Sequence, residues 1–211
     1  MKKQFLFAAA VLVAMSFAFT SCEDKDINNG AKTITSAGVI SGKLKTGNEK
    51  GEVIDVTNGV DSIAVVNGRG VIVAKGKLNN GSFSLTVPTP KDEELTLLSD
   101  GMSDGITLSN EATKANSGYR LIALKDGERV GSIERLALRD LEEIVAVMNI
   151  MYVDRQVDIT GTDGKRIYDV KFAAGWNVIV ETNVGGNSTS KYTANDEPAN
   201  ALWAFTPLMS Y

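Results

Sequence analysis

The amino-acid sequence predicts a mostly β protein, an antiparallel β-sandwich of one or two small β modules behind an N-terminal signal peptide. From Ala37 onward, apolar and polar residues alternate with a period of two, as they do in strands with one buried face. Turn sequences such as Asn-Gly and Asp-Gly recur along the chain, and many short strands separated in this way are typical of a sandwich or a barrel. The 211 residues, 43% of them hydrophobic, suffice for one or two small domains.

The chain begins with the features of an export signal. Lys2 and Lys3 precede an apolar run over residues 5–19, and small residues then precede Cys22, the only cysteine. Secretory signals combine a basic start, an apolar centre and small residues at the cleavage site, and they are removed from the mature protein. We therefore predict a signal peptide over residues 1–21 and, because residues 22–36 are polar and lack periodicity, a tether that carries the lipid described next.

The residues around the cysteine resemble a bacterial lipobox. The match is Phe19-Thr20-Ser21-Cys22, with Phe19 where leucine is commoner. The resemblance implies that Cys22 receives a diacylglycerol, that signal peptidase II cleaves before it, and that the new amine is acylated, which supplies the several lipid chains that stable anchoring needs. The predicted location is the outer membrane, through the lipid anchor. A free thiol in a secreted protein and an uncleaved apolar anchor are the alternatives.

Acidic residues follow the cysteine at once, at Glu23, Asp24 and Asp26. This start resembles the acid-rich segments that mark surface export in lipoproteins of the Bacteroidota, and the resemblance implies display on the cell surface. A solvated acidic linker explains the same residues on a protein that faces the periplasm. Both membrane faces therefore stay open.

The first β module is predicted over residues 37–100. In the strand SFSLTVP, Phe83, Leu85 and Val87 share one face, and Asn80-Gly81 before it is a hairpin turn because both residues accept positive φ. Prolines 88 and 90 end this run, since proline cannot donate to a ladder. Further strands are expected within 38–46, 61–68 and 68–79.

The second β module is predicted over residues 101–211, and the two modules either stay separate or pack as one domain. Loops are expected over 91–117 and 183–200. Residues 136–148 fit both helical and strand spacing, and we favour a short helical turn near 139–144 that leads into a strand from about Val145. Strands are also expected within 118–124, 156–161, 168–172, 176–180 and 201–208.

Two further resemblances concern these modules. GVISGKLKT and GSFSLTVP resemble the first and last parts of the transthyretin-like, carboxypeptidase-regulatory β-modules of bacterial envelope proteins, whose middle part is not matched here. MYVDRQVDITG and YDVKFAAGWNVIV are similar to a segment of uncharacterised lipoproteins of the Bacteroidota. The second resemblance implies a lipid-anchored envelope location and brings no activity with it.

The composition excludes several kinds of chemistry. Histidine is absent from the sequence, so Ser-His-Asp and Cys-His catalysis are excluded, as are zinc sites built on histidine or on a lipidated Cys22. No phosphate-binding GxxxxGK[ST] or GxGxxG sequence occurs, and we expect no cofactor. Removal of residues 1–21 leaves 20 basic and 26 acidic side chains, a balance that argues against nucleic acid as a partner.

Candidate polar sites are few. Asp100, Asp104 and Glu111 stand at positions one, five and twelve of an EF-hand-like calcium loop, but Met102 occupies position three, where an oxygen ligand is needed. An acidic surface loop is the alternative. Asp61-Ser62-Ile63 resembles the acceptor sequence for envelope O-glycosylation in the Bacteroidota, which implies a glycan on Ser62. An ordinary strand residue explains Ser62 equally.

Aromatic side chains are the remaining candidates for recognition. Trp176, Trp203 and Tyr192 could stack on sugar rings. Trp176, however, shares its strand face with Val178 and Val180, and Trp203 lies in a run that is apolar on both faces, so a core position is the alternative for both tryptophans. Tyr192, in the polar segment 183–200, is expected to be exposed.

These observations predict a non-enzymatic, lipid-anchored protein of the bacterial envelope with a binding role or an accessory role in surface assembly. Its expected partners are the membrane, through the lipid anchor, and a glycan or another envelope protein. A carbohydrate-binding surface module is the first alternative. A small hydrolase that uses a pair of carboxylates is the second.

Overall fold

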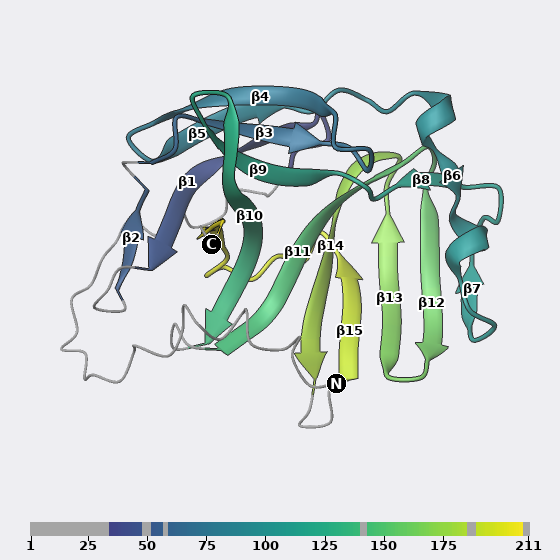
Figure 1. Cartoon of the computed structure of the whole chain (residues 1–211). Helices are drawn as coiled ribbons and strands as arrows, with labels where there is room; N and C mark the ends of the chain where they lie inside the picture. The colour runs from purple at the N-terminus through teal and green to yellow at the C-terminus, as the bar shows by residue number, and fades with distance from the viewer. Residues whose placement is uncertain (1–33, 48–51, 57–58, 140–142, 185–188, 209–211) are drawn as a thin grey trace, which may run out of the picture.

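The structure of the protein is a computed structural model that describes residues 34–47, 52–56, 59–139, 143–184 and 189–208 (Figure 1). The predicted signal peptide, the lipidation site Cys22 and most of the predicted tether lie outside the described residues. The tether was expected to extend to residue 36. Ile34, however, is 3% exposed and packs in the main core, so the last residues of that segment belong to the fold.

The described residues form sixteen β-strands and two short 3₁₀ helices, which confirms the prediction of a mostly β protein. The elements in the first half of the chain are β1 (Val39–Gly47), β2 (Val53–Asp55), β3 (Ser62–Val66), β4 (Ile72–Asn79), β5 (Ser82–Thr86), η1 (Asp92–Glu94), β6 (Thr96–Leu97), η2 (Leu98–Gly101) and β7 (Ile106–Leu108). Those in the second half are β8 (Lys114–Asn116), β9 (Arg120–Lys125), β10 (Glu128–Arg139), β11 (Glu143–Val153), β12 (Val157–Asp163), β13 (Arg166–Phe172), β14 (Gly175–Val184), β15 (Thr189–Ala194) and β16 (Leu202–Pro207).

Seven of the strands close into a barrel. Their order is β1, β5, β4, β3, β9, β10 and β16, and β16 returns to β1. This last pairing is parallel, with Leu44 opposite Trp203, whereas the other neighbours in the barrel are antiparallel. The predicted sandwich is therefore not confirmed. The alternation along a strand is the same in both architectures, and the difference arises from β16, which pairs with strands far away in the sequence.

Large apolar side chains fill the barrel, and two glycines make room for them. A Cβ at Gly42 would lie 2.5 Å from Cδ1 of Trp203, and a Cβ at Gly131 would overlap the ring of Phe205. Trp203 is only 2% exposed. The side chains buried around these rings include Ile40, Leu44, Ile63, Val65, Phe83, Leu85, Leu121 and Ile133.

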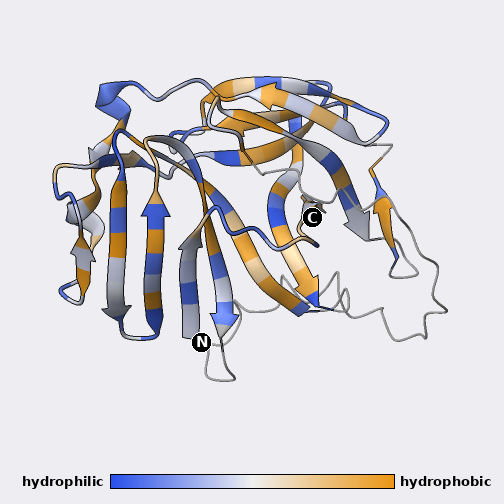
Figure 2. Ribbon diagram, turned by 180° about the vertical axis from the view of Figure 1, so that it is seen from behind, coloured by the Kyte–Doolittle hydropathy of each residue, from blue (hydrophilic) through white to orange (hydrophobic). Residues whose placement is uncertain are grey.

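The remaining long strands continue the sheet beyond the barrel, in the order β11, β14, β15, β13, β12 and β7 (Figure 1). One face of β11 and β14 joins the main core through residues such as Ile150 and Val178. The opposite face of these outer strands surrounds a second core that contains Val153, Val157 and Phe172. Hydrophobic and hydrophilic residues alternate along β12 and β13 in Figure 2, and the buried residues of these strands, Val157, Ile159, Val170 and Phe172, lie two positions apart.

Three local expectations were wrong, and one turn is confirmed. The segment 91–117, expected to form loops, contains the short strands β6, β7 and β8 and both 3₁₀ helices. The helical turn near 139–144 is not formed where the structure is described, since β10 continues to Arg139 and β11 begins at Glu143; the strand from about Val145 is confirmed. The loop over 183–200 contains β15, whose polar residues are half-buried between two strands. In the predicted hairpin turn, Asn80 and Gly81 have φ values of 48° and 75°.

The barrel takes strands from both predicted modules. Strands β9, β10 and β16 come from the second half of the chain and complete the barrel that β1, β3, β4 and β5 begin. The main core likewise contains residues from Ile34 to Trp203. Within the described ranges, the structure contains no helix of the length and apolar character needed to span a membrane.

The contact between Gly42 and Trp203 gives a first prediction. Gly42→Ala should destabilise the protein by about 1–3 kcal/mol, the usual range for overpacking a core, because the new methyl group meets the indole ring. Urea unfolding measures the change in the free energy of unfolding. Gly101→Ala is the control, because a Cβ there has no neighbour within 4 Å. Equal stability of the two variants would contradict the packing described for the barrel.

Candidate functional site

The sheet divides at β10, because three strands pair with it. β16 occupies one edge of β10 from Gly131 to Leu136. β9 and β11 share the other edge, with β9 paired as far as Ile133 and β11 paired from Arg135. Glu134 therefore lies where β9 and β11 diverge.

A second division lies on β11. β14 occupies one edge of β11 from Ala146 to Val153. The other edge pairs with β10 up to Met148 and with β8 from Tyr152, so the backbone at 149–151 faces a gap between them. The segment from β8 into β9 forms the third side of this gap. We call the opening bounded by β10, β11 and the segment 116–121 the three-strand junction.

A cavity of about 370 Å³ occupies the three-strand junction. Its lining includes three pairs of consecutive strand residues, Leu121/Ile122, Ile133/Glu134 and Met148/Asn149. Successive residues of a strand point to opposite faces of the sheet. The lining therefore includes residues of both faces of the sheet, and Leu121, Ile133 and Met148 among them belong to the main core. The volume of the cavity lies in the range of small-molecule sites.

Arg135 is the charged residue at the inner end of the cavity. Its side chain is buried, with the residue 7% exposed, and its Cζ atom lies 5.3 Å from the ring centroid of Trp203. Its Nε atom lies 3.6 Å from Oε2 of Glu197. Burial lowers the pKa of Arg135, and the carboxylate of Glu197 acts in the opposite direction. Because a guanidinium stays protonated in proteins, a positive charge is held against the indole ring inside the fold.

The outer part of the cavity is lined by more exposed polar side chains. Arg120, Arg129, Glu134 and Asn149 are exposed lining residues. The hairpin between β3 and β4 contributes the backbone of Gly68 and Gly70. The site thus combines an apolar wall, one buried and two exposed arginines, and a polar rim. Such a set can hold the body of a small molecule and orient its polar end.

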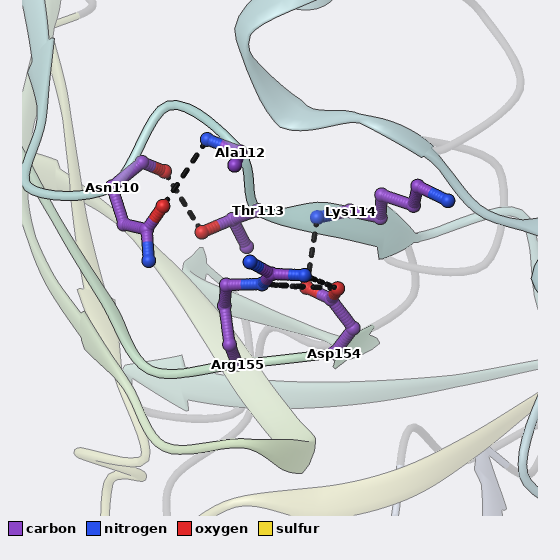
Figure 3. A network of polar contacts seen from close by, with 6 residues as sticks. All are labelled: Asn110, Ala112, Thr113, Lys114, Asp154 and Arg155. Atoms are coloured by element: carbon purple, nitrogen blue, oxygen red, sulfur yellow. Dashed lines mark hydrogen bonds and ion pairs between the residues drawn. The ribbon is translucent and has the colours of Figure 1, made fainter.

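A polar network fixes β8 to β11 and so maintains one side of the junction (Figure 3). The N–H of Lys114 donates to Oδ1 of Asp154 at 2.9 Å, and the N–H of Asp154 donates to the carbonyl of Lys114 at 3.0 Å. Arg155 donates to the same carboxylate from Nε and from its terminal nitrogen, the latter at 2.7 Å. Charge-assisted pairs of this kind are stronger than neutral hydrogen bonds.

The three aromatic residues predicted as glycan contacts do not form one surface. Trp176 and Trp203 are buried in the main core, 6% and 2% exposed, so their ring faces are covered. Tyr192 was expected to be exposed, but it is half-buried on β15 and stacks on Tyr168, with ring centroids 4.9 Å apart. Burial is the larger cause that raises the pKa of Tyr192, and hydrogen bonding to Glu181 acts in the same direction.

Of these three aromatic residues, Trp203 lines the cavity of the junction, and the other predicted site residues within the described ranges do not. Asp100, Asp104 and Glu111 are exposed, and nowhere in the described ranges do three or more acidic side chains form a group that could hold a metal ion. Ser62 is 3% exposed on β3, and its hydroxyl donates to Oδ1 of Asp61 at 2.6 Å, so its oxygen is covered in the folded chain. Cys22 lies outside the described residues.

Sequence reasoning missed the arginines of the junction. Arg120 and Arg129 look like ordinary surface charges on strands. The position of Arg135, by contrast, could be recognised from the sequence. The inward residues along β10 are Gly131, Ile133, Arg135 and Ala137. A charged residue therefore interrupts a face that is otherwise apolar or small. An arginine at an inward position needs a partner, and that requirement could have marked the site.

Comparison with known proteins gives no relative for this chain: no family model, no curated protein and no solved structure matches it.

The network of Asp154 gives a second prediction. The hydrogen bond from Arg155 is the main cause that lowers the pKa of Asp154. The ionised carboxylate therefore stabilises the fold above its unfolded pKa of about 3.9, and this contribution is lost as the pH falls through the lower folded value. At neutral pH, Asp154→Asn should reduce the free energy of unfolding by about 1–2 kcal/mol.

Urea unfolding at pH 7 and at successively lower pH tests this. The difference between wild type and Asp154→Asn should shrink below about pH 4, where the carboxyl of the unfolded chain begins to protonate, and should be lost once the pH falls through the lower folded pKa. Glu111→Gln is the matched control, because Glu111 is exposed and lies in the segment between β7 and β8, and it makes none of the hydrogen bonds to Asp154. A difference that stays constant with pH would show that the charge of Asp154 does not stabilise the junction.

Proposed function

We propose that the protein is a lipid-anchored, non-enzymatic protein of the bacterial envelope that binds a small ligand in the three-strand junction, in a binding or surface-assembly accessory role. The observation that carries the ligand-binding part is the cavity of about 370 Å³, whose lining combines residues of the main core with exposed polar residues. A cavity that joins an apolar interior to a polar rim is the ordinary form of a small-molecule site. The envelope location rests on the leader and on Cys22.

The lining of the cavity favours binding over hydrolysis. Glu134 is the one carboxylate among its lining residues. Glycoside hydrolysis of the usual kind needs two carboxyl groups that face each other across the substrate. Histidine, the commonest general base, is absent from the whole sequence. The site therefore offers contacts and charge to a ligand without an acid–base pair.

The anchor is tested by processing. Cys22→Ala should abolish labelling by radioactive palmitate and leave an unprocessed precursor, because the thiol is the acceptor of the lipid and marks the cleavage position. Globomycin, which inhibits signal peptidase II, should leave the wild type as an uncleaved precursor that still carries the diacylglycerol on Cys22. Ser21→Ala keeps a small residue before the cysteine and is the control. Unchanged labelling and processing of Cys22→Ala would refute the anchor.

The cavity is tested with a neutral apolar dye. N-phenyl-1-naphthylamine should gain fluorescence with the wild-type protein and lose this gain with Asn149→Trp, because an indole at this exposed lining position fills the opening. Asn183→Trp is the control, since Asn183 is exposed on β14 and does not line the cavity. Equal dye binding by both variants would place the dye outside the junction and would contradict the proposed site.

A further inference from the structure

The charges of the three-strand junction are unevenly distributed. Its lining includes three arginines, Arg120, Arg129 and Arg135, and a single acidic residue, Glu134. Even when Glu197, the neighbour of Arg135, is counted, cations exceed anions. The chain as a whole has the opposite sign, a formal net charge of −4. The positive excess is thus a local property of the junction.

We infer that the ligand of the three-strand junction is an anionic amphiphile, a small molecule with an apolar body and one carboxylate or similar anionic group. The inference rests on the proposed function, since it specifies the ligand of the same cavity. The apolar body is expected against the aliphatic wall, where Ile122, Leu121 and Ile150 line the cavity on both faces of the sheet. The anionic group is expected against the arginines.

The position of Arg135 strengthens the attraction for an anion. Its side chain is 8% exposed, and water is therefore largely excluded around the guanidinium. Charges interact more strongly in such surroundings than at the surface, where salt screens them within about 10 Å at ordinary ionic strength. Arg120 and Arg129, which are exposed at the rim, would act mainly through that screened, longer-range field. Guanidinium groups also match carboxylates geometrically, because two of their N–H groups lie parallel.

The dimensions argue for an amphiphile rather than a bare inorganic anion. A cavity of about 370 Å³ far exceeds the volume of one sulfate or phosphate ion, and its inner wall is formed by apolar and aromatic residues. Burial of apolar surface contributes about 25 cal/mol per Å². An inorganic anion would leave the apolar wall exposed to water, so it would lack the hydrophobic contribution to the binding free energy. A neutral amphiphile would gain no electrostatic attraction from the excess of positive charge in the lining.

Two dyes that differ by one anionic group test the inference. 8-Anilinonaphthalene-1-sulfonate carries a sulfonate that N-phenyl-1-naphthylamine lacks. The protein is the mature chain, residues 22–211, with Cys22→Ser, which contains every described strand and needs no detergent that would compete for the dyes. The sulfonate dye should bind about 5-fold to 10-fold more tightly than the neutral one, the effect expected from a few partly screened charges. Asn149→Trp should abolish the binding of both.

Charge variants separate the contributions. Arg120→Gln with Arg129→Gln should weaken the sulfonate dye about 5-fold and leave the neutral dye unchanged, whereas Glu134→Gln should strengthen the sulfonate dye about 2-fold. Lys77→Gln with Lys171→Gln removes the same charge from exposed positions outside the cavity and is the matched control. Decanoate should displace the sulfonate dye at lower concentration than decan-1-ol.

The outcomes distinguish the inference from the proposed function. If both dyes bind equally, or if the arginine and lysine variants behave alike, the ligand is not selected by charge. The inference of an anionic ligand then fails, whereas the proposed binding site in the cavity is not contradicted. If sulfate alone displaces the dye as well as decanoate does, the junction is an inorganic-anion site and the inference also fails. If neither dye binds, the proposed function itself is refuted.

Discussion

The structure depends on the pairing of β10 with three strands. Its twelve residues support β16 along one edge and β9 and β11 in turn along the other. The pairing with β16 closes the barrel, and the pairing with β11 attaches the outer strands. Because two partners cannot meet on one edge without diverging, the same arrangement opens the sheet between them. The cavity is thus a geometric consequence of joining a closed barrel to an extended sheet through one shared strand.

Trp203 connects this closure to the chemistry of the cavity. Its ring occupies the space left by Gly42, meets Phe83 edge to face at 5.6 Å, and donates from Nε1 to the carbonyl of Ser41 at 3.2 Å. The same ring also contacts the guanidinium of Arg135, whose Cζ atom lies 5.3 Å from the ring centroid. The side chain of Trp203 therefore packs inside the barrel and also contacts the buried charge of Arg135. Loss of the barrel seam would also displace the only lining arginine that is held inside the fold.

The sequence predicted strands well and their long-range arrangement poorly, for a physical reason. Alternation and turn chemistry are local, so the strand around Phe83 and the turn at Asn80-Gly81 could be recognised. The pairing of β1 with β16 joins positions far apart in the chain, and nothing in the alternation of either strand specifies it. The cavity depends on a second long-range feature, the divergence of β9 and β11 along β10, which is why its arginines read as surface charges. Only the inward register of Arg135 among small and apolar residues carried a local signal.

The buried ion pair of Arg135 and Glu197 is hard to explain by stability alone. Removing two charges from water is costly, and apolar residues of similar volume often stabilise a core as well or better. Elsewhere the described core relies on such residues, with Arg135 the only charged side chain among its fully buried positions. Arg135 is nevertheless one of the residues that line the cavity of the three-strand junction. A charge that is costly to bury, placed where a ligand can approach it, is better explained by recognition than by packing.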